Sequence, residues 1–319
     1  MVDYNPDFDT LATTTLQKFE PGFEEFISTR SSIYYFLKSN NRVVPVDGGR
    51  SIVEPLMYGE NSTAGTYDLY DDLDITPQDG MTAAEYPFRW HAVSIAISGP
   101  EKAMNSGPSA HINLLEAKIE QAKLSAAEQF EEMFQGDGTG NTGLDFLGLE
   151  ALIGDGSSSV TTVGNIDASD AQNAFWRSQI LRTQGTLTLK KLSHGHNVCV
   201  KGTMKPKWAQ TTLDLFEAYE ALLQPAQRFT DAKTAEAGFQ NLLHKACPVV
   251  WGDQVPSGTW TNINPEFIKL RTLTGKWLSA TPFQKPVNRD ASYAQLLSYG
   301  QLTTNNRRWV GSRLEDLTA

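Results

Sequence analysis

Two histidines and a cysteine, His194, His196 and Cys199, are the closest set of metal-ligating side chains in this sequence. Imidazole and thiolate are ligands that zinc prefers, but a zinc site also needs a fourth ligand and ordered groups behind the ligands. Because valines flank the cysteine, the segment is interpreted as a loop entering a strand. A metal-dependent hydrolase, which would require the three side chains to converge, is the lesser alternative function.

A glycine-rich run at 136–143, Gly-Asp-Gly-Thr-Gly-Asn-Thr-Gly, is the second candidate, because such runs can surround phosphate groups. It follows an expected helix instead of a strand and lacks the Lys-Ser/Thr pair that contacts phosphate and magnesium. Tight turns explain its glycines better than a bound nucleotide. No serine or cysteine has a base at a spacing typical of nucleophilic catalysis. We therefore expect no catalytic, cofactor or metal site.

Composition excludes several classes of protein. The chain has 319 residues, 27 Lys and Arg against 37 Asp and Glu, and a net charge of −10, which disfavours a protein that coats nucleic acid. Its two cysteines, Cys199 and Cys247, lie in separate segments, so reduced, buried thiols are expected instead of a disulfide framework. The acidic start does not resemble a signal peptide, and no apolar run approaches the ~20 residues that span a bilayer. We expect no membrane contact and synthesis in a cytosol.

A strand and a long helix must position whatever the chain presents. Residues 86–97 alternate, with Phe88 and Trp90 on one face and His91, Ile95 and Ile97 on the other. A helix is predicted from residue 109, after a Gly-Pro pair, to residue 135, before a glycine cap. Its apolar stripe is Ile112, Leu115, Ile119, Ala122, Ala126, Phe130 and Met133. At ~1.5 Å per residue this helix is roughly 40 Å long, and its single apolar side predicts that it lies across a sheet.

Opposite charges occupy two distant segments. Between residues 47 and 85 nine acidic residues stand against Arg50 alone, and four of them, Asp68, Asp71, Asp72 and Asp74, fall within seven residues. No acid lies between Asp170 and Asp214, where the cations are Arg177, Arg182, Lys190, Lys191, Lys201, Lys205 and Lys207. Such complementarity suggests contact between copies of the chain, with solvated faces as the alternative. A two-stranded arm cannot be stable alone, so the acidic segment needs a surface to lie on.

The remaining patterns are mixed and indicate the α+β class. Further helices are predicted at 23–39, 169–182 and 206–223. Strands are predicted at 248–251, 267–270 and 277–278, and a last pair at 293–302 and 308–314 is joined by a turn at 303–306.

The order of these features resembles the major capsid protein of tailed bacteriophages, with the Hong Kong 97-like fold. The order is a polar arm, an aromatic helix, an acidic two-stranded loop, a long helix, the Gly-Thr-Gly-Asn turn and the phrase Leu-Gly-Leu-Glu-Ala-Leu at 147–152. Similar phrases follow at 174–177, 227–231, 235–239, 247–253, 262–264, 267–270 and 305–314. The resemblance spans nearly the whole chain and depends on the order of the phrases, since no single phrase is diagnostic.

The resemblance implies an N-terminal arm at 1–45, an extended loop at 46–89, a peripheral domain with a spine helix at 90–145, an axial domain at 146–269 and a return to the peripheral domain at 270–319. It implies a non-catalytic protein that self-assembles through pentamers and hexamers into an icosahedral shell around double-stranded DNA, without sequence-specific binding. The location would be the virion, after assembly in the host cytoplasm. The partners implied are a separate scaffolding protein, a portal and a decoration protein.

Two consequences concern contacts between subunits. Some members of the family crosslink their shells through a lysine in the extended loop, but no lysine lies between Lys38 and Lys102, so a shell without such bonds is expected. The loop acids would meet cations of a neighbouring subunit, and the contact residues expected are Asp68, Asp71, Asp72, Asp74, Arg177, Arg182, Lys190, Lys191, Arg307 and Arg308. An encapsulin-type cellular compartment, which shares the resembling fold, is the main alternative function.

Overall fold

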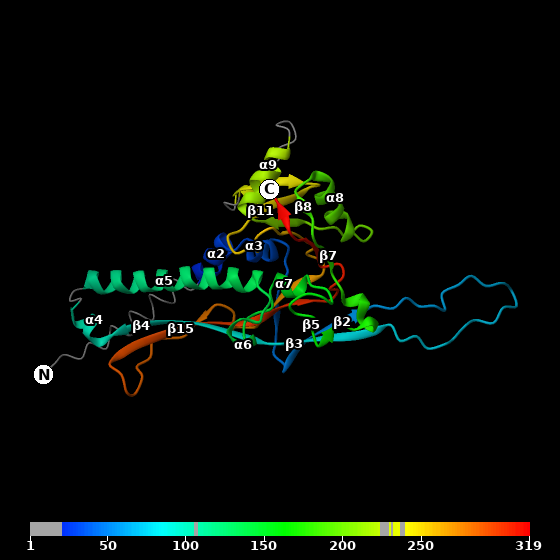
Figure 1. Ribbon diagram of the computed structural model, residues 1–319. Coiled ribbons are helices and arrows are strands. Elements are labelled where there is room, and N and C mark those ends of the chain that lie inside the picture. The colour runs from blue at the N-terminus through cyan, green and yellow to red at the C-terminus, as the bar shows by residue number, and fades with distance from the viewer. Residues whose placement is uncertain (1–20, 105–107, 224–229, 231, 237–239) are drawn as a thin grey trace.

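The computed structural model describes residues 21–104, 108–223, 230, 232–236 and 240–319 (Figure 1). Residues 1–20 of the expected N-terminal arm lie outside this part, as do portions of the phrases at 227–231 and 235–239. The side chains of Ile112 and Leu115, two members of the expected helical stripe, are also outside it. Within the described part, helices and strands are interspersed as the α+β class requires.

The long helix α5, Pro108–Gln135, runs along a five-stranded sheet, as its single apolar side predicts (Figure 1). Ile119, Ala126 and Phe130 are buried on the side of the helix that faces the sheet. The ring of Phe130 lies 4.7 Å from that of His91 on β4, Arg89–Ser98. Lys118 Nζ also donates to the carbonyl of Ala96 on β4 at 3.0 Å. The helix is therefore confirmed, and β4 is the strand that lies beneath it.

The five-stranded sheet is built around one long strand, β15, Ala291–Thr304. Strand β4 pairs antiparallel with β15 from Ser98 opposite Ala291 to Arg89 opposite Gly300. The other strands are β1 (Val43–Val46), β13 (Ile268–Leu273) and β14 (Ser279–Ala280), in the order β1-β13-β15-β14. The inward side chains of β4 and β15 form one core with the apolar face of α5.

A six-stranded sheet lies on the other side of α5 and carries helices α8, Leu189–Val198, and α9, Leu213–Leu222 (Figure 1). Its order is β10 (Asn241–His244), β11 (Cys247–Trp251), β9 (Trp208–Thr211), β12 (Trp260–Ile263), β16 (Gly311–Leu314) and β7 (Gln179–Leu181). Trp260, Tyr219 and Leu192 belong to a second apolar core between this sheet and its helices. Trp208 of β9, Val250 of β11 and Ile263 of β12 belong instead to the first core, so the six-stranded sheet contributes to both cores.

A hairpin leaves the body beside the two sheets and ends in a long loop. Strand β2, Ser51–Met57, pairs antiparallel with β3, Met81–Pro87, and residues 58–80 extend beyond the last pair (Figure 1). We call residues 58–80 the projecting loop. The strand expected at 86–97 is in fact two strands, β3 and β4, which are separated by the buried Phe88 and pair with different partners.

The helix expected at 23–39 is two helices, α2, Pro21–Arg30, and α3, Ser32–Ser39. Ser31 stands between them in an extended conformation, and its hydroxyl accepts from the N–H of Tyr34 at 3.3 Å. A serine that caps a new helix in this way ends the preceding one, because its own backbone is not helical. The periodicity across residues 23–39 does not reveal this break.

Three further predictions of helix or loop were wrong. Residues 169–182 form a short 3₁₀ helix, Ala171–Trp176, followed by β7. Residues 206–211 are not the start of a helix but contain β9, a fully buried strand, and the helix begins only after Thr212. The segment at His194–Cys199 is the end of helix α8 and its cap, not a loop entering a strand. A fully buried strand shows no alternation, so periodicity alone cannot separate it from a helix.

The last two strands were expected to pair across the turn at 303–306, and this was also wrong. β15 belongs to the five-stranded sheet, whereas β16 pairs with β12 and β7 in the six-stranded sheet. The chain thus crosses between the sheets after β15, and its final strand does not return to the sheet beneath α5. The boundary predicted at residue 269, between an axial part and a returning peripheral part, stays a prediction.

The remaining elements are short. They are α4 (Gly99–Met104), α6 (Gly140–Gly143), α7 (Leu149–Leu152), β5 (Thr162–Val163), β6 (Ile166–Asp167), β8 (Gly185–Thr186), α10 (Ala232–Glu236) and β17 (Leu317–Thr318).

Candidate functional site: the projecting loop and its surroundings

The projecting loop is closed at its base by two glycines and is held beyond them only by local bonds. The N–H groups of Tyr58 and Gly59 both donate to the carbonyl of Gly80, at 3.0 and 3.2 Å. A Cβ atom on Gly59 would lie 2.9 Å from the Cα of Gly80, so the two strands meet more closely than side chains allow. Farther out, Asp74 accepts from the hydroxyl of Thr76 at 2.6 Å and from its N–H at 2.9 Å. These two bonds lower the pKa of Asp74.

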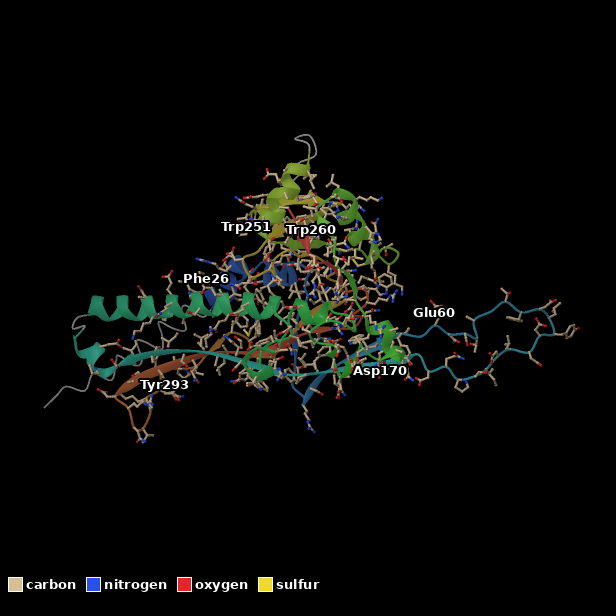
Figure 2. All side chains as sticks on the ribbon, in the orientation of Figure 1. Phe26, Glu60, Asp170, Trp251, Trp260 and Tyr293 are labelled. Atoms are coloured by element: carbon tan, nitrogen blue, oxygen red, sulfur yellow. The ribbon has the colours of Figure 1, made fainter. Side chains whose placement is uncertain are left out.

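Large apolar side chains stand in solvent along this loop, between its acids. The exposed fractions are 70% for Tyr67, 89% for Leu69, 99% for Tyr70, 63% for Leu73 and 91% for Ile75. Figure 2 shows the loop side chains extending away from the body, beyond Glu60. So many exposed apolar groups in one segment are typical of a surface that another molecule covers. The acidic residues of this loop were predicted from the sequence to be contact residues, and its apolar residues were not, although leucine and tyrosine are interspersed with aspartate at 68–74.

The root of the hairpin is firmly attached to the body. Glu54 on β2 is 2% exposed, and its Oε1 accepts from Arg271 Nε at 2.6 Å and from the Thr303 hydroxyl at 3.1 Å. The Tyr58 ring stacks on Phe175 with 4.4 Å between centroids. The root of the hairpin is therefore fixed to the body, whereas the tip of the loop is uncovered.

The cations expected to receive the loop acids are mostly engaged within their own chain. Arg177 Nε donates to the carbonyl of Ala168 at 2.7 Å, and Lys191 Nζ donates to the carbonyl of Thr186 at 2.7 Å. Arg182 binds Asp155 through two nitrogens, at 2.7 and 2.9 Å, and this pair holds the pKa of the Asp155 carboxyl well below its usual range. Lys190 and Arg308 are exposed, and the Arg308 guanidinium lies 5.6 Å from the ring of Trp309.

Arg307 lies inside the molecule and not on a surface. It is 0% exposed, and its guanidinium donates to the carbonyls of Ala151, Val160 and Thr161 at 2.6, 3.1 and 3.0 Å. Burial lowers the pKa of Arg307 to about 10. Because another chain cannot reach it, Arg307 leaves the set of expected contact residues. Its neighbour Arg308 points outward, and a sequence of two adjacent arginines does not say which of them is buried.

The three candidate metal ligands do not converge. His194 is exposed, whereas His196 and Cys199 are buried at the end of α8. His196 Nε2 lies 3.5 Å from the thiol of Cys247, whereas the thiol of Cys199 contacts the backbone carbonyl of His196 at 3.3 Å. The ring of His244 lies 6.3 Å from that of His196. Among the described residues no group of three or more His, Cys, Asp or Glu could hold a metal ion. Burial raises the pKa of Cys199 to about 11 and that of Cys247 to about 12, so both thiols stay protonated at neutral pH.

The glycine-rich run turns the chain at the end of α5, as its glycines predict. Asn141 and Thr142 both have positive φ, which lets the chain reverse within a few residues. The run lines a hollow of about 620 Å³ with Trp90, Glu132 and Asp145. The acids beside it and the C-terminal end of α5 both disfavour a phosphate.

No family model matches the sequence, and no curated protein matches it either. Several solved structures are nevertheless similar to this chain in fold. The capsid of cyanophage A-1(L) is similar over 89% of this chain and 93% of that one, with a TM-score of 0.65 and 16% identity. The capsid of a native GTA particle is similar over 91% of each chain, with a TM-score of 0.58 and 11% identity. The chain has the Hong Kong 97-like capsid fold. A holo-SrpI encapsulin complex from Synechococcus elongatus PCC 7942 is similar at a TM-score of 0.51 and 12% identity, over 87% of this chain and 86% of that one.

Helix α5 falls where the spine helix is predicted, and residues 58–80 fall within the segment predicted as the extended loop. The described helices include none that is both long and apolar enough to cross a membrane.

Proposed function

We propose that this chain is the major capsid protein of a tailed bacteriophage, which self-assembles into the icosahedral shell enclosing a double-stranded DNA genome. The similarity to phage capsids over about nine-tenths of both chains is the observation that carries the proposal. The uncovered apolar and acidic loop supports it, because a subunit that leaves such a segment in solvent gains stability by joining another copy. The protein would reside in the virion and be assembled in the host cytoplasm. Its partners would be other copies in pentamers and hexamers, a scaffolding protein, a portal and a decoration protein.

The charge of the chain agrees with a container and not with a nucleic-acid coat. A net charge of −10 does not favour the wrapping of phosphates, so DNA would be enclosed without sequence-specific binding. The role proposed is structural, and no catalytic step is part of it.

Assembly of the expressed protein tests this function. The chain is expressed alone and together with its candidate scaffolding protein, and the products are examined by sedimentation and negative-stain microscopy. We expect closed shells that dissociate into single chains in hot detergent, because the loop has no lysine for a covalent crosslink. A compact monomer near 35.2 kDa under every condition would contradict the proposal. Covalent ladders on a denaturing gel would contradict the expectation of a shell without crosslinks.

An encapsulin-type compartment is the second candidate, and the similarity to the SrpI encapsulin supports it with the lower TM-score. The contents of particles purified from the natural source separate the two functions. Nuclease-protected double-stranded DNA of a uniform length indicates a phage capsid. A protein cargo without DNA indicates an encapsulin.

A further inference from the structure

An open pocket of about 680 Å³ lies at the foot of the hairpin that carries the projecting loop. Five segments far apart in the sequence line it: the start of β2, the junction of β3 and β4, Leu147, the turn between β5 and β6, and β15. Its charged and amide side chains are Arg50, Glu85, Arg89, Asn165 and Gln301. Tyr86, Leu147 and Val163 add apolar surface to its wall.

This pocket presents hydrogen-bond donors that lack acceptors. Gln301 is 0% exposed, and its Oε1 accepts from the N–H groups of Leu147 and Leu302 at 2.9 and 3.2 Å. Its Nε2 has no partner among the described residues, and neither has the buried Nε of Arg89. A buried donor without an acceptor costs free energy, typically ~1–3 kcal/mol, so a ligand that enters the pocket and brings an acceptor into contact with either donor would be stabilised. We call it the donor pocket.

The ligand that fits is an anion with apolar neighbours. Arg50 and Arg89 form no ion pair with any other residue that the structure describes, and the planar guanidinium is suited to carboxylates and phosphates. The chain itself carries such a ligand in its projecting loop, where Asp71, Asp72 and Asp74 alternate with exposed leucine, tyrosine and isoleucine side chains. We propose that the donor pocket receives the acidic segment 68–75 of the projecting loop from a second copy of the chain.

A second copy must supply the segment, because the loop projects away from its own foot (Figure 1). Residues 58–80 go out and back, so about eleven residues lead to the tip, and at ~3.3 Å per residue the loop reaches at most ~36 Å. A contact in which the loop of one copy enters the foot of the next is head-to-tail, and such contacts close into rings when the rotation allows. The inference therefore rests on the proposed shell and specifies one contact within it.

One group at the rim opposes the ligand. The Glu85 carboxylate is exposed and accepts from the Ser51 hydroxyl at 3.5 Å, which leaves its negative charge facing the solvent beside Arg50. An incoming aspartate is repelled by this charge. Removing it should strengthen docking, whereas removing the arginine charges should weaken it. A variant that merely failed to fold would weaken docking in both cases, so opposite effects of the two kinds of substitution on docking would indicate a specific contact.

Binding of a labelled peptide of residues 64–78 to the unassembled full-length protein tests the pocket without shells. Fluorescence anisotropy should show binding that weakens about tenfold in Arg50→Glu/Arg89→Gln, since two charge-assisted contacts are lost. It should tighten about twofold to threefold in Glu85→Gln. Lys285→Glu is the matched control, an exposed cation before β15 that does not line the pocket, and should change nothing. No peptide binding, or equal weakening by the Lys285 variant, would overturn the proposal.

A disulfide between copies tests the same contact in assembled shells. Asp71→Cys/Arg50→Cys should give covalent oligomers on a non-reducing gel, because a disulfide needs Cα atoms only ~4.4–6.8 Å apart. Asp71→Cys/Lys285→Cys should give none, and both natural cysteines are buried. Well-formed shells without crosslinks would contradict the inference and leave the proposed function intact. Peptide binding by a protein that forms no shells would support the inference and contradict the proposed function. Binding of a short DNA duplex that Arg50 and Arg89 support, in the absence of peptide binding, would assign the pocket to phosphate instead.

Discussion

The projecting loop and the body beneath it use charge in opposite ways. In the body, charged side chains lie against partners of the same chain: Glu54 between Arg271 and Lys269, Arg182 on Asp155, Arg307 on three carbonyls. In the loop, the acids have only local hydrogen bonds and stand beside exposed apolar groups. Charges of the first kind maintain the fold, and charges of the second kind are free to serve contacts between copies. The difference predicts that mutations in the two regions affect different measurements.

Reversing the loop charges gives the largest expected effect. Asp71→Lys/Asp72→Lys/Asp74→Lys should abolish shell formation or make it strongly dependent on salt, because every copy in the shell repeats the lost contacts. The free energy of unfolding of the unassembled chain should change by less than ~0.5 kcal/mol, since these side chains are exposed. Sedimentation at low and high ionic strength and thermal melting measure the two effects. Normal shells at low ionic strength would mean that the loop charge has no part in assembly.

Arg307 and Arg308 are adjacent in the sequence, but the first is buried and the second is exposed. Arg307→Met removes the donor from the carbonyl oxygens of Ala151 and Val160, whereas that of Thr161 still accepts from the N–H of Ala168 at 3.1 Å. Each unpaired group costs ~1 kcal/mol or more, so the chain should lose about 2 kcal/mol of stability. Arg308→Met removes an exposed charge and should cost less than ~0.5 kcal/mol. Urea unfolding of both variants gives the two values. Equal costs would show that burial does not separate these arginines.

Some parts of the fold and of the site could be predicted from the sequence, and others could not. The helix at 109–135 and its position over β4 followed from spacing alone, because a one-sided stripe has one way to be buried. β9 and β7 were missed, because a fully buried strand and a short edge strand show no alternation that periodicity could detect. The donor pocket was also out of reach, since Arg50, Arg89 and Gln301 meet only through the pairing of β15 with β4 and the packing of the hairpin. The acidic residues of the loop were predicted to be contact residues from their charge, and the apolar residues between them were not recognised.

The six-stranded sheet contributes a dependence on pH that the loop should lack. His244 is buried with its Nε2 unpartnered among the described residues, and burial, with His196 and Lys245 nearby, lowers its pKa to about 4. An unfolded histidine takes its proton near pH 6.5, so below that pH the unfolded chain binds a proton that the folded chain does not. Stability is complete above pH 6.5 and should fall by about 2 kcal/mol between pH 6.5 and pH 5.

His244→Phe isolates this contribution from that of other titrating groups. The phenyl ring keeps the packing against Tyr219 and Trp260 and cannot be protonated, so its unfolding free energy should depend less steeply on pH over the same range. Urea unfolding at intervals of pH compares the two chains. Parallel curves for the natural chain and the variant would show that His244 does not titrate between the folded and unfolded states.

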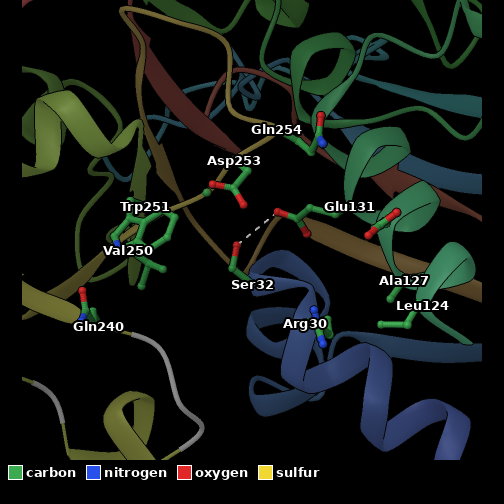
Figure 3. A pocket seen from close by; sticks show the side chains of 12 residues that line it. Arg30, Ser32, Leu124, Ala127, Glu131, Gln240, Val250, Trp251, Asp253 and Gln254 are labelled. Carbon is green, nitrogen blue, oxygen red and sulfur yellow. Dashed lines mark hydrogen bonds between the residues drawn. The ribbon is translucent and has the colours of Figure 1, made fainter. Parts of the chain in front are cut away.

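The smallest expected effect concerns Glu131, which has neutral partners where Glu54 has cations. Its carboxylate accepts from the hydroxyls of Ser31 and Ser32 and from Gln135 Nε2, beside a cavity of about 450 Å³ (Figure 3). Burial raises the pKa of Glu131 because no cation compensates its charge there, and the hydroxyl and amide donors offset only part of this cost. The buried oxygen Oε1 of Gln210, on β9, has no partner among the described residues. The charge of the Glu131 carboxylate therefore adds nothing to the stability of the fold.

Glu131→Gln and Glu54→Gln should consequently move stability in opposite directions. Above the ordinary glutamate pKa the unfolded chain carries a solvated carboxylate, whereas the fold must bury one at Glu131, so the neutral amide should raise stability by about 0.5–1 kcal/mol at pH 8. The new amide also offers an N–H to Gln210 Oε1, and the gain should vanish near pH 4, where the natural carboxyl is protonated in both states. Glu54→Gln leaves Arg271 and Lys269 without their counter-charge and should cost about 2 kcal/mol. Urea unfolding at pH 8 and pH 4 measures both, and a loss of stability in Glu131→Gln at pH 8 would show that this carboxylate stabilises the body through its charge, as Glu54 does.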